Sequence, residues 1–485
     1  MKKRLLTDTE PKLLLKYFED FTFIPRESGN EKGISDYLIA FAKENGLEYY
    51  RDEYFNVLIK KPASPGYEDH DTIILQAHID MVCEKNREVE FDFENDPIVF
   101  EVEDDKIISK ETTLGADNGI GLAFCLAALS DPDLKHPAIE FLGTADEERG
   151  MSGIENFNFD LLKGSKVINM DSGDEGIMVV GCAGGPVVRN ELPITKIDAD
   201  PEKAFYEITL RGLIGGHSGE DIHRGRANAN KLFARLLMAI RDEIDYDLAD
   251  ISGGLKYNAI PRNAECIIAI DKDNESKLMA VVENYQAIYK DEYRVNDPNI
   301  KLSCAAAPHQ LTVLSEDSKM RILDYITFCE TGIVRMDMDN PEYVESSLSL
   351  GVVTLKEDFA EIWVMTRSSK TSQFNAMLQK IVRLTESFDG KYEIMSNCPA
   401  WEYDPNSVLK ETFTTVYKEQ YGTEPKSMVM HAGLETSEFA KKIERKLDMI
   451  SLGPDVRNFH APGEYVIISS VKRTWECVKK FIEAL

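Results

Sequence analysis

The chain has 485 residues, of which 43% are hydrophobic and 29% are charged. This composition is typical of a soluble globular protein, and the length exceeds what one compact core holds, so two or more domains are expected. The formal net charge of −29 disfavours nucleic acid and anionic membranes as partners, because both repel an acidic surface.

The N-terminal segment, residues 1–21, starts with basic residues, but charges interrupt its apolar pattern. This predicts an amphipathic helix and not an export signal. No stretch reaches the roughly 20 apolar residues that a membrane span needs. The eight cysteines are scattered, with no CxxC pair. We therefore expect a cytoplasmic protein with free thiols and no membrane partner.

The first part of the chain alternates between helical and strand patterns. Helical periodicity covers residues 12–21 and 34–46, and an almost wholly apolar helix is expected over 119–131. Short apolar runs predict strands over 56–61, 72–79, 138–145 and 166–171. This alternation predicts an α/β fold with a mainly parallel sheet and helices on both faces. In such a sheet, ligands bind outside the carboxyl ends of the strands.

The pattern changes near residue 189. Alternation with period two predicts half-buried strands over 205–216, 264–272, 346–357 and 360–369, and helical periodicity covers 227–244, 274–289, 319–332 and 372–388. An antiparallel sheet with helices on one face is expected, and two related α+β halves remain open.

The first pattern returns near residue 389. Helices are expected over 408–422 and 469–485, and short apolar runs over 426–433 and 447–454. The predicted organisation is therefore a first domain formed by residues 1–188 and 389–485, interrupted by an inserted α+β lid domain over 189–388.

Charged side chains gather where the predicted strands of the first domain end. They are His78, Asp80, Asp117, Asp146, Glu147, Glu148, Asp171 and His460. Taken singly, such residues are more often a structural histidine, a turn former or a solvated helix start. Their joint occurrence at strand ends favours a site for two divalent cations, because buried carboxylates need a positive counter-charge. Mixed carboxylate and imidazole ligands suit zinc, and cobalt or manganese remain open.

The pair His78 and Asp80 fits this interpretation. Residues i and i+2 of a strand point to the same side, so both side chains can reach one site. A histidine that binds a metal usually needs a carboxylate on its other ring nitrogen.

The motifs AHIDMV, LGADNGIG, TADEERGMSG, MDSGDEG, GGHSGEDIHRGRANA and FHAPGEYV together resemble the di-zinc exopeptidase family of aminoacylases, carboxypeptidases and carnosinases. Within that family the chain is most similar to the Xaa-His dipeptidase branch, over essentially its whole length.

This resemblance implies a role for each residue that matches a family motif. Asp117 matches the carboxylate that bridges both metals. His78 and Asp171 match the other ligands of one ion. Glu148 and His460 match the other ligands of the second ion. It implies that Asp80 orients His78, that Glu147 is the general base, and that a cis peptide follows Asp117. It also implies that His217 stabilises the oxyanion and, less directly, that Arg367 clamps a substrate carboxylate. Asn258 and His431 are further candidates for substrate contact.

The function that follows is metal-dependent hydrolysis of short peptides, with a metal-activated water and Glu147 as base. Closure of the inserted domain would assemble the site if His217 and Arg367 lie on it. Two alternatives remain open: a deacylase acting on N-acyl amino acids, and a binding protein that kept the fold and lost catalysis. The residues do not decide whether a C-terminal histidine is preferred, or whether the protein forms a homodimer.

Overall fold

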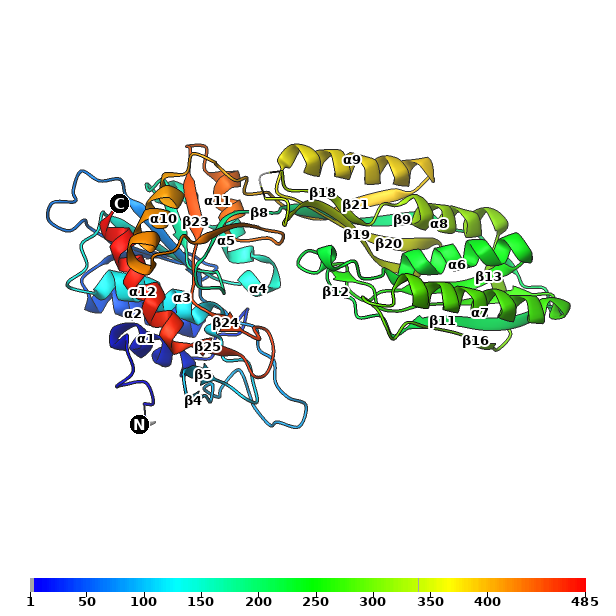
Figure 1. The fold of residues 1–485 in the computed structure, drawn as a ribbon, viewed down its shortest axis with the longest axis horizontal. Helices are drawn as coiled ribbons and strands as arrows, with labels where there is room; N and C mark the ends of the chain where they lie inside the picture. The colour runs from blue at the N-terminus through cyan, green and yellow to red at the C-terminus, as the bar shows by residue number, and fades with distance from the viewer. Residues whose placement is uncertain (1–3, 339) are drawn as a thin grey trace. The chain divides into compact units, whose positions relative to one another are not determined.

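The computed structural model describes residues 4–338 and 340–485, without the side chains of Ser396 and Asn397. This part of the chain forms two compact units. Unit 1 comprises Met1–Gly181, Tyr403–Met430 and Leu434–Leu485, and unit 2 comprises Cys182–Glu402 and His431–Gly433. In Figure 1, unit 1 joins the blue and cyan start of the chain to its orange and red end, and unit 2 is green to yellow.

The changes of unit at 181/182 and 402/403 lie 7 residues before and 14 residues after the predicted domain boundaries. The boundary at 188/189 lies inside strand β9 (Gly185–Pro193), and the boundary at 388/389 follows helix α9 (Thr371–Ser387). The division at these residues, and the role of the inserted part as a lid, stay predictions.

Unit 1 is built on an eight-stranded sheet with the order β1-β2-β6-β3-β7-β23-β8-β22. The strands are β1 (Glu48–Arg51), β2 (Val57–Lys61), β6 (Ile139–Thr144), β3 (Ile73–His78), β7 (Lys166–Asn169), β23 (Asp448–Ser451), β8 (Ile177–Cys182) and β22 (Lys426–Met430). The four central strands β6, β3, β7 and β23 are parallel, whereas β1, β2 and β8 pair antiparallel. The α/β fold is confirmed, and its parallel part is the centre of the sheet.

The central strands have apolar sequences because both of their faces are covered. Every residue of β3 and of β6 is buried, as expected for parallel strands packed between helices. The helices of unit 1 are α1 (Lys12–Thr22), α2 (Lys32–Glu44), α3 (Ala116–Ser130), α4 (Glu147–Gly150), α5 (Ser152–Asn156), α10 (Val408–Tyr421), α11 (Thr436–Lys442) and α12 (Ile468–Glu483), with a 3₁₀ turn at Phe159–Leu161. Helix α3 packs on β3 and α1, and α10 packs on β23 and α12.

A second, four-stranded sheet in unit 1 has the order β24-β25-β5-β4. Its strands are β24 (Val456–Arg457), β25 (Tyr465–Ile467), β5 (Lys106–Ile108) and β4 (Glu101–Glu103). The loop between β24 and β25 carries His460, so this small sheet anchors one of the predicted site residues.

Unit 2 contains a nine-stranded sheet whose described strand pairs are antiparallel, as predicted. Its order is β16-β11-β15-β13-β19-β20-β9-β21, and β18 also pairs with β19. The strands are β16 (Lys301–Ala306), β11 (Ala204–Arg211), β15 (Ala264–Ile270), β13 (Asp247–Gly253), β19 (Val344–Leu355), β20 (Phe359–Ser368), β9 (Gly185–Pro193), β21 (Lys391–Cys398) and β18 (Gly332–Met336). Two further two-stranded sheets pair β10 (Lys196–Asp198) with β17 (Thr312–Leu314) and β12 (Gly216–His217) with β14 (Ala259–Ile260), each antiparallel.

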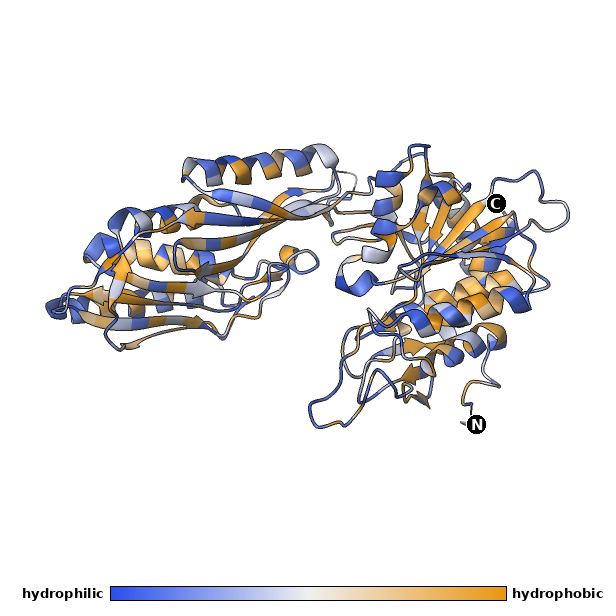
Figure 2. Cartoon of the chain, turned by 180° about the vertical axis from the view of Figure 1, so that it is seen from behind, coloured by the Kyte–Doolittle hydropathy of each residue, from blue (hydrophilic) through white to orange (hydrophobic). Residues whose placement is uncertain are grey.

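Four long helices pack against this sheet. They are α6 (Ala229–Glu243), α7 (Glu275–Glu292), α8 (Glu316–Phe328) and α9 (Thr371–Ser387), with 3₁₀ turns at Ile222–Arg224 and Lys272–Asn274. Alternate strand residues, such as Ile208 and Leu210 of β11, share one buried cluster with apolar residues from all four helices. Side chains of a strand alternate between faces, so the helices cover one face of the sheet. Figure 2 shows the matching pattern, with apolar and polar sides on these helices and apolar strands at the centre of unit 1.

No helix among the described residues is long and apolar enough to cross a membrane.

Candidate active site and metal centre

His78, Asp171 and Glu147 lie at or just beyond the carboxyl ends of neighbouring parallel strands of unit 1, whereas Asp117 and His460 do not follow strands of this sheet. His78 is the last residue of β3 and pairs in register with Thr144, the last residue of β6. Asp171 follows the end of β7 by two residues, and Glu147, three positions after the end of β6, starts helix α4. Parallel strands that end together bring the loops after them to one edge, which is where α/β sheets bind ligands.

Asp117 lies at the start of helix α3, where its backbone and that of Asn118 depart from helical geometry. The Asp117–Asn118 peptide is cis, as the resemblance implied. The carboxylate of Asp117 faces two imidazoles: Oδ1 lies 3.1 Å from His78 Nε2, and Oδ2 lies 3.2 Å from His460 Nε2. One carboxylate therefore stands between two histidines that are 382 positions apart in the chain, which is the arrangement expected of a bridging ligand.

Each imidazole also faces a second carboxylate. Asp171 Oδ1 lies 3.7 Å from His78 Nε2, and Glu148 Oε1 lies 3.0 Å from His460 Nε2. Two groups result, which share Asp117: the His78 subsite with Asp171, and the His460 subsite with Glu148. Single ligand atoms of His78, Asp117 and Glu148 all lie within 4.8 Å of one another.

These residues fit a pair of divalent cations. Glu148 Oε1 is buried and makes no hydrogen bond within the described structure, although His460 Nε2 is 3.0 Å away. Two ligand atoms that are close but not aligned as donor and acceptor suit a shared cation. The carboxylates of Asp117 and Glu148 raise the pKa of His460 to about 11. The group thus attracts positive charge, as a metal site of oxygen and nitrogen ligands does.

Asp80 is fully buried beside His78, with its Oδ1 3.3 Å from His78 Nδ1. Its other oxygen accepts a hydrogen bond from Ser28 Oγ at 2.7 Å, and the amides of Glu147 and Glu148 donate to its two oxygens at 3.2 Å each. Burial acts to raise the pKa of Asp80, but these contacts together lower it below its usual value. A charged Asp80 can therefore orient the His78 ring.

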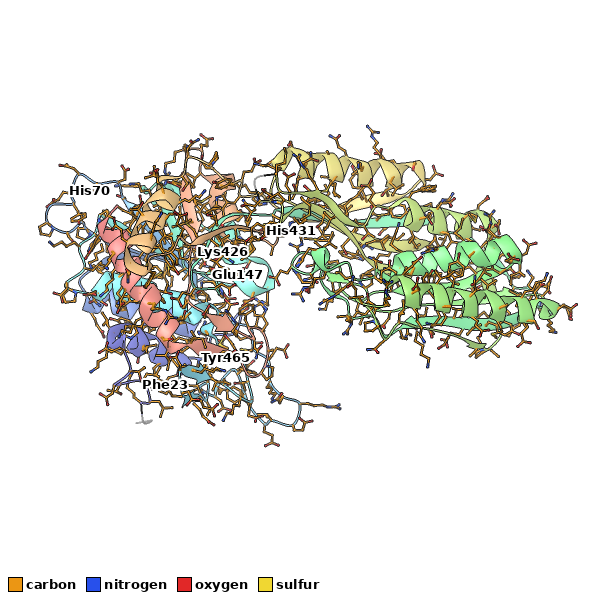
Figure 3. All side chains as sticks on the ribbon, in the orientation of Figure 1. Phe23, His70, Glu147, Lys426, His431 and Tyr465 are labelled. Atoms are coloured by element: carbon orange, nitrogen blue, oxygen red, sulfur yellow. The ribbon has the colours of Figure 1, made fainter. Side chains whose placement is uncertain are left out.

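Glu147, labelled in Figure 3, is the first residue of α4. Burial raises the pKa of its carboxyl group well above the usual range, and Asp171 and Glu148 raise it further, whereas His78 acts in the opposite direction.

The predicted residues of unit 2 also come together. Arg367, on β20, is 7% exposed, and its Nη2 lies 3.2 Å from His217 Nε2 on β12. His431 Nε2 lies 2.7 Å from Ser347 Oγ, and Ser347 pairs in register with Arg367 (Figure 3 labels His431). A Cβ atom added to Gly219 would lie 2.2 Å from the carbonyl oxygen of His431 and 2.9 Å from Arg367 Nε, so these residues are closely packed.

Asn258 differs from the other three residues of this group. It is exposed, and its backbone carbonyl accepts a hydrogen bond from the amide of Ser218 at 2.9 Å. The backbone of Asn258 thus holds the residue that follows β12, and the predicted contact of its side chain with substrate stays a prediction.

The electrostatics of this cluster in unit 2 favour an anion. No carboxylate of the described residues forms an ion pair with Arg367, and its Nε is buried without a hydrogen-bond partner. Burial and the Arg367 charge lower the pKa of His217 to about 4, so this ring is neutral at pH 7. The Glu220 amide donates toward His217 Nδ1, and Arg367 Nη2 donates toward His217 Nε2. A neutral ring accepts at only one of these nitrogens and carries its single proton on the other.

Sequence reasoning missed several residues that support the site. Arg26 and Ser28 contact the segment after β3, and Glu464 contacts the segment before α3. Glu435 is fully buried, and its Oε2 accepts hydrogen bonds from Gln76 and Thr144. Glu464 lies inside the motif FHAPGEYV, so its position was a usable signal; a single sequence offers none for the others.

The fold and this set of side chains define a metal-dependent hydrolase. A family model described as "Peptidase family M20/M25/M40" matches residues 74–484, and the chain belongs to this family. A curated relative, the cytosol non-specific dipeptidase of Escherichia coli (strain K12), is 34% identical over 480 residues, which cover 99% of both chains.

Solved structures agree. An aminoacylhistidine dipeptidase from Vibrio alginolyticus is 35% identical, has a TM-score of 0.89, and is matched over 99% of this chain and 98% of its own. An aminopeptidase from Bacillus cereus ATCC 10987 is 16% identical with a TM-score of 0.57, over 98% of this chain and 99% of its own, and shares the fold. The predicted family, and an enzyme of the metal-dependent dipeptidase class, are therefore confirmed.

Proposed function

We propose that the protein is a cytoplasmic dipeptidase whose dinuclear centre, at the carboxyl edge of the unit 1 sheet, hydrolyses the peptide bond of dipeptides, including those with a C-terminal histidine. The observation that carries this proposal is Asp117, whose two oxygens each face a different imidazole, 3.1 and 3.2 Å away. The names of the two relatives support the substrate class: a non-specific dipeptidase and an aminoacylhistidine dipeptidase. The Escherichia coli relative is named as a cytosolic enzyme, which supports a cytoplasmic location for this protein.

We assign one ion to His78, Asp117 and Asp171 and the other to Asp117, Glu148 and His460. Three carboxylates and two imidazoles suit zinc best, and the same donors accept cobalt or manganese. When bound, such ions lower the pKa of a water and polarise the peptide carbonyl.

Glu147 and Asp80 have separate tasks in this proposal. Glu147, next to a metal ligand but outside the ligand set, accepts the proton of the attacking water at its carboxylate and delivers it to the leaving amine. Asp80, whose Oδ1 lies 3.3 Å from His78 Nδ1, orients the ring by its charge so that His78 Nε2 faces the centre.

The cluster of Arg367, His217 and His431 is proposed to bind the negatively charged parts of the substrate. The terminal carboxylate of a dipeptide has the planar pair of oxygens that a guanidinium recognises. A neutral His217 with its proton on Nε2 can donate to the same carboxylate or to the oxyanion of the tetrahedral intermediate.

A deacylase that cleaves N-acyl amino acids is the second candidate function, because its substrates also end in a carboxylate and contain an amide. The same donors at Arg367 would serve both classes, so only a comparison of substrates separates them. A homodimer stays a prediction.

The decisive experiment measures metal content and hydrolysis on one purified sample, before and after chelation. We expect two ions per chain and cleavage of Xaa-His and other dipeptides, with activity lost on chelation and restored by zinc. Two ions without dipeptide cleavage, but with cleavage of N-acyl amino acids, would favour the deacylase. A folded protein that binds no metal would contradict the proposal.

A matched pair of variants tests the ligand set. His460→Ala is expected to lower the metal content, because it removes a ligand of one ion. His70→Ala is the control, since His70 is an exposed histidine of the same unit, labelled in Figure 3. Retention of both ions at full affinity in His460→Ala would remove His460 from the set.

A further inference from the structure

Glu464 is a buried carboxylate that binds four consecutive backbone amides. Its Oε2 accepts from the amides of Leu114 and Gly115 at 2.7 and 2.9 Å, and its Oε1 from those of Ala116 and Asp117 at 2.7 and 3.1 Å. Its exposed fraction is 1%. The amides at the start of α3 have no other cap, because the N-cap residue is Gly115, which has no side chain. A carboxylate at this end of a helix is also favoured by the helix dipole.

Glu464 thereby joins two loops that carry metal ligands. It lies four positions after His460 and directly before β25 (Tyr465–Ile467), and the amides that it binds include that of Asp117. Both loops contribute to the same subsite, because His460 Nε2 and Asp117 Oδ2 are 3.2 Å apart. A displacement of Glu464 would therefore change the distance between these two ligands.

Arg26 makes the complementary set of contacts, to carbonyl groups. Its Nη1 donates to the carbonyls of Ile79 and Asp80 at 3.1 and 2.6 Å, and its Nη2 donates to the carbonyl of Gly115 at 2.5 Å. Arg26 is 3% exposed. It connects the segment after β3, which follows His78, to the loop of Asp117. These two segments form the His78 subsite, in which His78 Nε2 and Asp117 Oδ1 are 3.1 Å apart.

The glycines of the motif LGADNG leave room for this arginine. A Cβ atom on Gly115 would lie 2.5 Å from Arg26 Nη2, and one on Gly119 would lie 2.6 Å from the same atom. Gly115 also has a φ of +71°, which a residue with a side chain rarely adopts. The peptide of Gly115 is held on both sides, since its amide binds Glu464 and its carbonyl binds Arg26.

We propose that Glu464 and Arg26 are positioning residues of the dinuclear centre, each for one subsite: Glu464 sets the distance between His460 and Asp117, and Arg26 sets the distance between His78 and Asp117. Neither touches the substrate or the reacting atoms. The inference rests on the proposed function, because it concerns the metals of that site. The alternative is a purely structural role, in which both residues only stabilise the fold, as any buried, hydrogen-bonded charge does.

Glu140 provides the matched control. It is also a carboxylate of unit 1 with an exposed fraction of 3%, and it also accepts from two backbone amides, those of Lys163 and Gly164, at 2.8 and 3.0 Å. It is the second residue of β6 and lies at the end of that strand away from the site. A merely structural role predicts similar behaviour for Glu464→Gln and Glu140→Gln.

The experiment uses full-length protein loaded with Co²⁺, and compares wild type, Glu464→Gln, Glu140→Gln and Arg26→Lys. The readouts are the visible absorption spectrum of the bound cobalt, the dissociation constant of each ion by competition with a chelator, and the melting temperature of the metal-free protein. We expect Glu464→Gln and Arg26→Lys each to weaken one ion by about 10- to 100-fold and to change the spectrum. Glu140→Gln should keep the wild-type spectrum and affinities, whatever its melting temperature.

Wild-type spectra and affinities in folded Glu464→Gln and Arg26→Lys would overturn the inference. If Glu464→Gln does not fold, Glu464→Asp takes its place, because it keeps the charge and shortens the side chain; wild-type metal affinity in that variant would overturn the role of Glu464 equally. A wild-type protein that binds no metal would contradict the proposed function, and the inference with it. A wild type with two ions and unperturbed variants would contradict the inference alone.

Discussion

Glu147 and Glu148 are neighbours in the chain, but their carboxylates have different surroundings. Glu148 Oε1, proposed as a ligand, is buried and 3.0 Å from His460 Nε2. Asp80 accepts hydrogen bonds from both of their amides, so the backbone that carries the two carboxylates is held beside His78. One carboxylate can thus serve a cation while the other exchanges protons.

The variant Glu147→Gln should therefore keep both ions and lose catalysis. General bases contribute about 10² to 10⁴-fold, and kcat is expected to fall by a factor in that range. Metal analysis and steady-state kinetics on the same sample test this. Glu155→Gln, an exposed glutamate of the next helix, is the control. Unchanged kcat in Glu147→Gln would remove it as the base.

Arg367 is expected to act on substrate binding. Arg367→Lys keeps the charge but loses the planar pair of donors, so KM for dipeptides should rise about 10- to 100-fold, with a smaller change in kcat. Arg189→Lys is the control, because Arg189 lies in the same sheet and is paired with Glu361 at 2.6 Å. A substrate that lacks the terminal carboxylate, such as a dipeptide amide, should be insensitive to Arg367→Lys. An equal loss for acid and amide substrates would contradict carboxylate binding.

The two histidines beside Arg367 make the stability of unit 2 dependent on pH. Burial and the Arg367 charge lower the pKa of His217 to about 4 and that of His431 to about 3. The unfolded chain binds protons at these residues below about pH 6.5, whereas the folded chain does not, so stability is present above that pH and is lost as the pH falls.

Urea unfolding at pH 7 and pH 5 tests this dependence. Between these values the wild type should lose about 2 to 3 kcal/mol more than the double variant His217→Gln/His431→Gln, a figure that is reduced for solvent screening because both rings are only partly buried. Equal losses in the two proteins would show that neither histidine resists protonation in the folded state.

At the scale of the elements, the strands of the site could be predicted because their sequences are locally distinctive. The runs at 72–79, 138–145 and 166–171 are apolar for a strand's length and end in charged residues, and they became β3, β6 and β7. The antiparallel strands of the inserted part were visible from alternation, as in β11. Strand order was not visible, because pairing depends on contacts between distant segments.

The contacts made by the supports of the metal centre could not be predicted from the sequence for the same reason, although Glu464 stands inside a recognised motif. Glu464 and Arg26 reach Gly115 across 349 and 89 positions, and neither residue has a local pattern that marks it as buried. By contrast, the proposed ligands His78 and Asp171 stand at or just after strand ends, and a resemblance to known motifs could place the other proposed ligands.

A substitution at Gly115, in the turn between β5 and α3, tests whether the close packing of Arg26 against this turn supports the metal centre. Gly115→Ala should cost about 1 to 2 kcal/mol for its positive φ and more for the contact with Arg26, and it should weaken metal binding. Gly422→Ala is the control: Gly422 ends α10 with a φ of +72° and nothing within 4 Å of an added Cβ atom. Thermal unfolding and metal titration of both variants separate backbone strain from the local contact. Equal effects of the two substitutions would mean that the space around Gly115 is not limiting.

At the scale of the molecule, the two units have separate cores: residues from β3, β6 and α3 belong to one buried cluster, and residues from β11, β15 and α6 to another. The five proposed metal ligands all lie in unit 1. The free energy of metal binding should therefore stabilise unit 1 and leave the sheet of unit 2 largely unaffected, since a ligand stabilises only the structure that binds it.

Hydrogen exchange measured by mass spectrometry, with and without chelation, resolves this difference. Chelation should increase exchange in peptides covering 73–80, 112–119 and 455–467, because their amides lie in or beside the loops that hold the ligands. Peptides covering 204–211 and 264–270, in β11 and β15, should exchange at the same rate in both states. Restored protection after zinc is added back would show that the change is reversible. Equal deprotection of both sets would mean that metal removal unfolds the chain as one cooperative structure, and the independence of the two cores would be wrong.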